Sequence, residues 1–288
     1  MAKENTVILY GMLERPPVVR VTNDGDYVSG RITLSTVRRS FVNEDFEMRG
    51  PIRMDFPCVF SKNDKIIKYE IEPLKKGDIV LVKGSLCTLD TEKTFYCPQC
   101  GEKVALEQAV VVYIDPLDIK RVIEAPAFME DGIPGGIKWE EWETKSFREL
   151  VHNDEFSNLA MVMGTVIRDP DYYSEGPDGK KECQFQIVCP RKRRIKEDPP
   201  DKNADFPWVK IYGVKAEEAF DALSEGSKIY INGAIQTRSF QRQFNCKYCG
   251  PFEKEAGASE IVPYDIEYME NCNLPESTHL NDEEGYDA

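Results

Sequence analysis

KKGDIVLVKGSLCT (75–88) and SEGSKIYINGAIQT (224–237) read as one segment written twice in the same chain. Each has a Gly at its third position, a run rich in β-branched and apolar residues, a second Gly at its tenth position and a final Thr. Such a run bounded by glycines is typical of a β-strand. The two stretches therefore predict the same strand in two copies of one domain.

Further pairs of landmarks keep the same order around these strands. They are NTVILYG (5–11) with NLAMVMG (158–164), RITLSTVRR (31–39) with QFQIVCPRK (184–192), DFP (55–57) with DFP (205–207), and PLDI (116–119) with PYDI (263–266). Matches that recur in register along a chain indicate repetition of a whole structural unit. We infer an internal duplication of a complete domain.

Each copy reads as five strands with one short helix between the third and the fourth. In copy two, Ala216, Ala219, Phe220 and Leu223 fall at helical spacing and predict one apolar face; Ile67, Ile71 and Leu74 do the same in copy one. Five strands with this helix are the plan of the OB-fold, a small, partly open barrel. We expect a mainly β protein of two tandem OB-folds.

The predicted boundaries divide the chain into four parts. They are an OB-fold at 1–122, a linker with a possible short helix at 123–157, an OB-fold at 158–272 and an acidic, disordered tail at 273–288. The linker carries Trp139 and Trp142, which either pack on a barrel or dock a partner.

The composition indicates a soluble protein. No apolar run approaches the ~20 residues of a membrane span, and the N-terminus lacks the pattern of a signal peptide, so we expect a cytoplasmic protein that meets no membrane. The net charge of −14 disfavours nucleic acid as a partner, yet PRKRRIK (190–196) places five cations in seven residues. A local basic patch on an acidic protein is therefore compatible with nucleic-acid binding.

CPQCG (97–101) and CKYCG (246–250) lie at equivalent places in the two copies, 20 residues after Gly77 and Gly226. Cys-x-x-Cys-Gly is the knuckle shape of zinc ribbons, and a structural zinc takes four thiolates. If the two hairpins that carry the knuckles meet, Cys97, Cys100, Cys246 and Cys249 form one structural Zn²⁺ site per chain. Pairing of each knuckle with another chain and free cysteines without metal are the alternatives.

The sequence contains no catalytic constellation. Its two histidines, His152 and His279, lie in the linker and the tail and belong to no motif. We do not expect an enzyme.

Three stretches resemble the bacterial and phage-type single-stranded DNA-binding protein family. They are GMLERPPVVRVTNDGDYVSGRITLSTVRRSF (11–41), GTVIRDPDYYSEGPDGKKECQFQIVCPRKRR (164–194) and GSKIYINGAIQTRSF (226–240). The resemblance covers most of the chain, although the family lacks the Cys-x-x-Cys knuckles. It implies a basic groove in which aromatic side chains stack on bases.

The resemblance assigns contact residues to both copies. The stacking candidates are Phe56, Phe60, Phe206, Trp208, Tyr212 and Phe240, and the alternative for each is packing in the core. The cationic candidates are Arg38, Arg39, Arg191, Lys192, Arg193, Arg194, Lys196, Lys210 and Arg238. Copy one has Leu89 or Asp90 near the position of Phe240, so it departs from the family at a stacking position.

The resemblance also implies an assembly and a role. Family members present four barrels, so two barrels per chain predict a homodimer. The implied function is non-sequence-specific binding of single-stranded DNA in replication, recombination or mobile-element and phage DNA metabolism, with replication or recombination proteins recruited through the acidic tail. The alternatives are an OB-fold scaffold for protein interactions in a replisome, transcription or transfer complex, and a module that binds single-stranded RNA.

Overall fold

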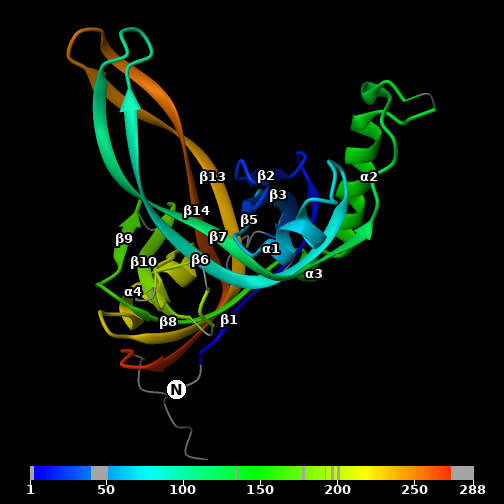
Figure 1. The fold of residues 1–288 in the computed structure, drawn as a ribbon. Coiled ribbons are helices and arrows are strands. Elements are labelled where there is room, and N and C mark those ends of the chain that lie inside the picture. The colour runs from blue at the N-terminus through cyan, green and yellow to red at the C-terminus, as the bar shows by residue number, and fades with distance from the viewer. Residues whose placement is uncertain are drawn as a thin grey trace, which may run out of the picture.

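The structure is a computed structural model that describes residues 3–39, 51–133, 135–176, 179–191, 193–195, 198–199 and 202–273. Two β-barrels lie side by side, and a long hairpin projects from each (Figure 1). The mainly β architecture of two tandem OB-folds confirms the predicted fold class.

Barrel 1 comprises β1 (Asn5–Leu13), β2 (Val18–Val21), β3 (Tyr27–Arg39), β4 (Ile52–Asp55), β5 (Cys58–Ser61), β6 (Ile79–Tyr96) and β7 (Lys103–Ile123), with α1 (Asp64–Ile66) and η1 (Ile67–Ile71) between β5 and β6. Barrel 2 comprises β8 (Asn158–Val166), β9 (Asp171–Ser174), β10 (Lys181–Pro190), β11 (Ala204–Asp205), β12 (Trp208–Tyr212), α4 (Val214–Ala222), β13 (Lys228–Cys246) and β14 (Gly250–Glu270). Between the barrels lie η2 (Met129–Asp131), α2 (Trp139–His152) and α3 (Asp154–Ser157).

Equivalent contacts build the two barrels. One parallel pair joins β5 to β7 at Val59 and Ile114, and its counterpart joins β12 to β14 at Val209 and Ile261. These two pairs fix the register between the copies, because Val59 and Val209 occupy the same position in their barrels.

The first strands of the two barrels pair with each other. β1 and β8 run antiparallel with Val7 opposite Ala160, which joins the barrels in one continuous sheet. At the start of β8 the buried Asn158 side chain donates to the Ile235 carbonyl and accepts from its N–H, and Asn5 does the same with the equivalent Leu86. The duplicated Asn therefore ties each first strand to the fourth strand of its own barrel.

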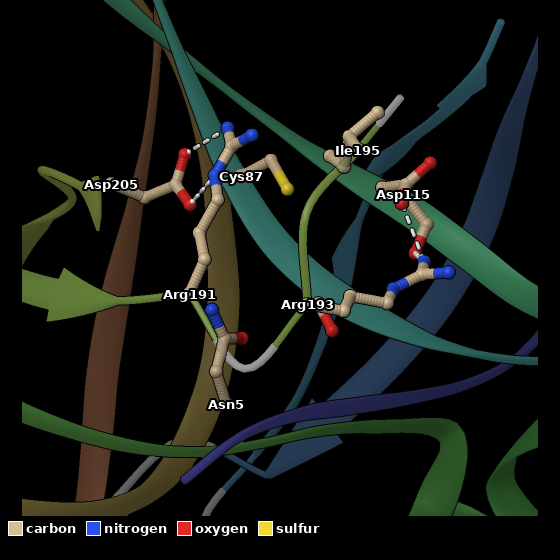
Figure 2. A pocket seen from close by; sticks show the side chains of 8 residues that line it. Asn5, Cys87, Asp115, Arg191, Arg193, Ile195 and Asp205 are labelled. Atoms are coloured by element: carbon tan, nitrogen blue, oxygen red, sulfur yellow. Dashed lines mark hydrogen bonds and ion pairs between the residues drawn. The ribbon is translucent and has the colours of Figure 1, made fainter. Parts of the chain in front are cut away.

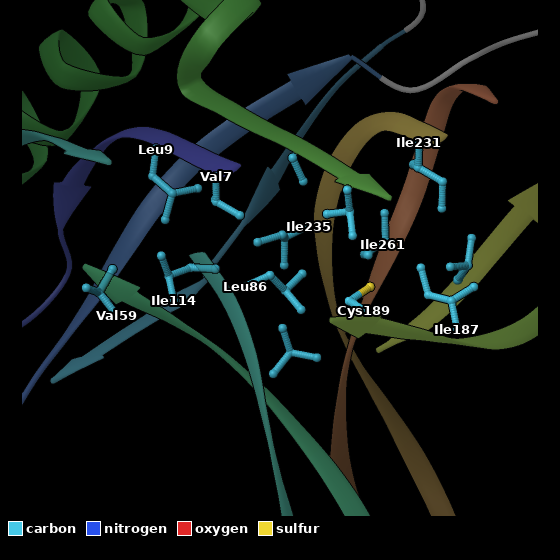
Figure 3. Packing of buried hydrophobic residues seen from close by; sticks show 14 of the residues in the cluster. Val7, Leu9, Val59, Leu86, Ile114, Ile187, Cys189, Ile231, Ile235 and Ile261 are labelled. Atoms are coloured by element: carbon cyan, nitrogen blue, oxygen red, sulfur yellow. The ribbon is translucent and has the colours of Figure 1, made fainter. Parts of the chain in front are cut away.

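One hydrophobic core runs through both barrels. Buried side chains from β1, β5, β6 and β7 pack in the same cluster as those from β10, β13 and β14 (Figure 3). Leu9 and Phe185 are fully buried, as the apolar alternation of their strands predicts.

The barrel helices differ from the predicted pattern in one residue. Ala216 and Ala219 of α4 and Leu223, which follows the helix, are buried, but Phe220 is 42% exposed. Its ring stacks on Tyr172 of β9, with ring centroids 5.0 Å apart. The prediction for Phe220 was wrong because its ring covers the barrel edge instead of entering the core.

The linker tryptophans pack on barrel 1. Trp142 is buried, and its indole N–H donates to the Gly77 carbonyl at 2.9 Å. Trp139 packs edge-on against Phe128, and the ammonium of Lys76 lies 3.5 Å from its ring centroid. These contacts favour packing over partner docking. Within the described residues, no helix has the length and apolar character needed to cross a membrane.

Candidate nucleic-acid interface and metal centre

The β6–β7 and β13–β14 hairpins project in the same direction, and their tips lie together (Figure 1). The turns at these tips hold Cys97, Cys100, Cys246 and Cys249, whose Sγ atoms all lie within 4.8 Å of one another. The prediction that the two knuckles meet is confirmed, and they meet within one chain.

The sulfur arrangement fits a tetrahedral thiolate site. The Sγ atoms of Cys100 and Cys246 are 3.6 Å apart. Four sulfurs at ~2.3 Å from a zinc ion would be separated by about 3.8 Å. Gly101 and Gly250, which follow the knuckles, have φ values of +73° and +84°, a conformation that glycine adopts readily. Hydrogen bonds from the Cys100 and Gln99 amides lower the pKa of Cys97 to about 7.

Aromatic packing supports the hairpin tips. Phe95 of the first hairpin and Phe244 of the second have ring centroids 4.5 Å apart, and Phe244 also stacks on Phe252. Arg242 pairs with Glu107 across the two hairpins. The tips are thus already in contact through side chains other than the cysteines.

Barrel 2 exposes aromatic rings beside cations. Phe206 is 37% exposed and Tyr212 is 36% exposed, and Trp208 is half-buried. The guanidinium of Arg168 lies 4.6 Å from the Trp208 ring centroid, and Arg238 lies 5.0 Å from that of Phe240. These rings can accept a stacked base, since none of them is fully buried in the core.

Barrel 1 offers fewer rings. Phe56 is 44% exposed, but Phe60 is half-buried and packs edge-on against Tyr113. Because Val59 and Val209 are equivalent, Phe60 corresponds to Lys210 and not to Tyr212.

The counterpart of Phe240 in barrel 1 also lacks a ring. Counting back six residues from Cys97 and Cys246 pairs Thr91 with Phe240, so the residue at that position is neither Leu89 nor Asp90.

Three of the cationic candidates are buried and ion-paired. Arg38 pairs with Asp55, Arg191 with Asp205 and Asp198, and Lys210 with Glu182. These cations satisfy carboxylates inside the protein, so we leave Arg38, Arg191 and Lys210 out of the contact set.

The pKa values at these pairs follow their surroundings. Burial raises the pKa of Glu182, but Lys180 and Lys210 outweigh it and the pKa falls below its usual value. Burial would lower the pKa of Arg191, yet hydrogen bonds to its carboxylates raise it. Glu182 and Arg191 therefore remain ionised at neutral pH.

Three further cations are partly exposed and paired. Arg193 donates to Asp115 of barrel 1, close to the buried pair of Arg191 and Asp205 (Figure 2). The other two pairs are Arg39 with Asp154 and Arg238 with Glu260. Arg194 is exposed, while Lys192 and Lys196 lie outside the described residues.

Two reciprocal pairs of hydrogen bonds join the barrels, and they were not predicted from the sequence. Asp205 accepts the Thr88 N–H at 2.7 Å while the Thr88 hydroxyl accepts the Phe206 N–H at 2.9 Å. On the other side, Asp55 accepts the Thr237 N–H at 2.7 Å and the Thr237 hydroxyl accepts the Phe56 N–H at 2.7 Å. The repeated DFP motif was the available signal. Each exposed Phe is thereby held against the other barrel.

The comparisons with known proteins point to one family. The model of the single-strand binding protein family matches residues 157–248. Single-stranded DNA-binding protein 1 of Clostridium acetobutylicum is 24% identical over 114 residues, which are 39% of this chain and 94% of that protein. The single-stranded DNA-binding protein of Fusobacterium nucleatum is 29% identical over 86 residues, 30% of this chain and 55% of that one.

Solved structures extend the likeness to the whole fold. The wild-type single-stranded DNA binding protein from Thermus aquaticus is 16% identical, with 96% of this chain and 97% of that chain covered and a TM-score of 0.52. A deletion variant of the same protein matches at 17% identity with the same TM-score, over 96% of this chain and all of that one. At this identity the likeness shows the fold alone.

Proposed function

We propose, from the premise that this chain is a member of the single-strand binding protein family, that it binds single-stranded DNA without sequence preference. The observation that carries the proposal is the set of surface rings on barrel 2: Phe206 and Tyr212 are exposed, and the half-buried Trp208 and Phe240 lie beside Arg168 and Arg238. Stacking contributes about 1–3 kcal/mol per base and tolerates any base. Phosphate contacts supply the remainder of the affinity and make it depend on salt.

The set of residues that we propose to contact DNA is smaller than the set predicted from the sequence. It keeps the rings of Phe56, Phe60, Phe206, Trp208, Tyr212 and Phe240 and the cations Arg39, Lys192, Arg193, Arg194, Lys196 and Arg238, and adds Arg168. Barrel 2 contributes most of them, so we propose that it provides the main binding surface.

Binding to a fluorescent dT oligomer, followed by anisotropy over a salt series, tests this function. We expect tight binding at low salt and a linear fall of log K with log salt concentration. Absence of binding at low salt would refute the proposal. Competition with an rU oligomer decides between DNA and RNA.

We further propose that the four clustered cysteines hold one structural zinc ion per chain. The 3.6 Å separation of the Cys100 and Cys246 sulfurs supports a tetrahedral thiolate site, and two of the four thiols are buried. When bound, zinc would link the two hairpin tips, and four protein ligands leave no coordination position for a substrate. Native mass spectrometry should find one zinc per chain; two zincs or none would contradict it.

We also propose a homodimer with four barrels. The outer face of the sheet at the barrel junction carries half-exposed apolar side chains: Ile8, Leu159, Met161, Met163 and Tyr230. A twofold interface brings the same patch of two copies together, so an apolar surface patch suits it. Light scattering should give twice the chain mass of 32.9 kDa; a single chain mass would exclude the dimer.

The cellular role follows from this activity. We propose that the protein acts in the cytoplasm, without catalysis, on transient single strands in replication, recombination or mobile-element and phage DNA metabolism. The acidic tail at 273–288 would recruit replication or recombination proteins; its residues 274–288 lie outside the described residues.

A further inference from the structure

Gln236 of β13 lies at the junction of the barrels with both ends of its amide engaged. Its Oε1 accepts from the Arg38 guanidinium of barrel 1 at 2.6 Å. Its Nε2 donates to the Tyr212 hydroxyl and to Glu260, each at 2.8 Å. A guanidinium can only donate and a carboxylate can only accept. These two partners therefore fix which end of the amide faces Tyr212.

This orientation decides what the Tyr212 hydroxyl can do. Since the hydroxyl oxygen accepts from the Gln236 amide, its own proton remains to be donated elsewhere. The described residues offer that proton no acceptor, and the Tyr212 ring is 36% exposed. Burial raises the pKa of Tyr212, so the hydroxyl keeps its proton at neutral pH.

Arg38 is itself held from barrel 1. Its Nε donates to Asp55 at 2.6 Å, and the same carboxylate accepts the Thr237 N–H of barrel 2 at 2.7 Å. Arg38 is 7% exposed and Asp55 is 1% exposed, so neither reaches a ligand. The chain of contacts runs from Asp55 through Arg38 and Gln236 to the exposed Tyr212.

The equivalent place on the other side of the junction lacks this arrangement. Arg191 and Asp205 correspond to Arg38 and Asp55, but Cys87 occupies the position of Gln236 and Lys62 that of Tyr212. A thiol cannot bridge a cation to a phenol as an amide does. Both barrels thus have the buried arginine, but only barrel 2 has the glutamine and the tyrosine whose hydroxyl that glutamine orients.

We propose that barrel 1 positions the binding surface of barrel 2: Arg38 sets the Gln236 amide so that the Tyr212 hydroxyl donates a hydrogen bond to an acceptor on the bound strand. Arg38 is a positioning residue that touches no DNA, and Tyr212 contacts the strand with both its ring and its hydroxyl. The inference rests on the proposed binding of single-stranded DNA.

A double-mutant cycle tests it. We would measure dT-oligomer affinity over a salt series for wild type, Tyr212→Phe, Gln236→Met and the double variant, with Tyr10→Phe as the matched control. Tyr10 also bonds through its hydroxyl, to Glu149, but lies outside this network. Gln236→Met leaves the pair of Arg38 and Asp55 intact, so the variant should fold.

Each single variant should bind about tenfold more weakly, because one hydrogen bond to the strand is lost. The double variant should bind no more weakly than either single variant, and Tyr10→Phe should bind as wild type does. Thermal melting checks that Arg38→Met folds. The folded variant should bind the oligomer about tenfold more weakly, with an unchanged dependence of log K on log salt concentration.

Three results would overturn the inference. They are wild-type affinity in Tyr212→Phe or Gln236→Met, additive losses in the double variant, and a salt slope reduced by about one in Arg38→Met, which would make Arg38 a phosphate contact. A wild-type protein that binds no oligomer would remove the proposed function and this inference together.

Discussion

Replacing Asp205 by Asn should destabilise the protein strongly while leaving the shape of the side chain unchanged. The Asp205 carboxylate is fully buried and accepts from Arg191 Nε at 2.7 Å, from Arg191 Nη2 at 2.8 Å and from the Thr88 N–H at 2.7 Å. Removing one partner of a buried ion pair costs about 3–5 kcal/mol, because the other charge stays buried. Asp198 still pairs with Arg191, so we expect a loss of about 3 kcal/mol.

Equilibrium urea unfolding followed by circular dichroism measures this loss. Asp221→Asn is the control, since Asp221 is exposed on α4 and should change stability by less than about 0.5 kcal/mol. A loss below about 1 kcal/mol in Asp205→Asn would refute the reasoning that the buried Asp205 carboxylate stabilises the fold through Arg191 and Thr88.

Three other predictions address the metal, the basic loop and the dimer. Cys246→Ser should lose the bound zinc in native mass spectrometry, and retention of one zinc per chain would contradict a four-thiolate site. Arg194→Glu should weaken oligomer binding and reduce the salt slope by about one, because Arg194 is exposed, whereas an unchanged slope would remove it from the contact set. Met161→Glu should convert the dimer into single chains in light scattering, since it places a charge in the centre of the apolar face; an unchanged mass would exclude that face.

The fold could be predicted from the sequence because the two copies share short local patterns. Strand alternation, the repeated glycines and the twin knuckles each occur twice in the same order, and each depends on neighbouring residues only. The meeting of Cys97 with Cys246 followed from the same symmetry. Phe220 escaped the prediction because helical spacing alone does not tell whether a ring enters the core or stacks on a neighbouring strand.

The binding surface was predicted less well because charge pairing is a long-range property. Nothing near Arg38 or Arg193 in the sequence indicates that Gln236 or Asp115 will meet them in space. A chain with net charge −14 offers many carboxylates as partners for an Arg-rich run. Only the three-dimensional fold determines which of them form ion pairs with it. The parallel pairings of Val59 and Val209 place Phe60 at the position of Lys210, in agreement with the spacing from the two DFP motifs.

The quenching of tryptophan fluorescence by dT oligomers tests the central claim most directly. Trp139 and Trp142 pack on barrel 1, so a base that stacks on barrel 2 should quench Trp208 alone. We predict saturable quenching at low salt that high salt reverses and that Trp208→Phe abolishes while binding persists. Full-size quenching in Trp208→Phe, or binding by the wild-type protein without quenching, would contradict base stacking on this surface.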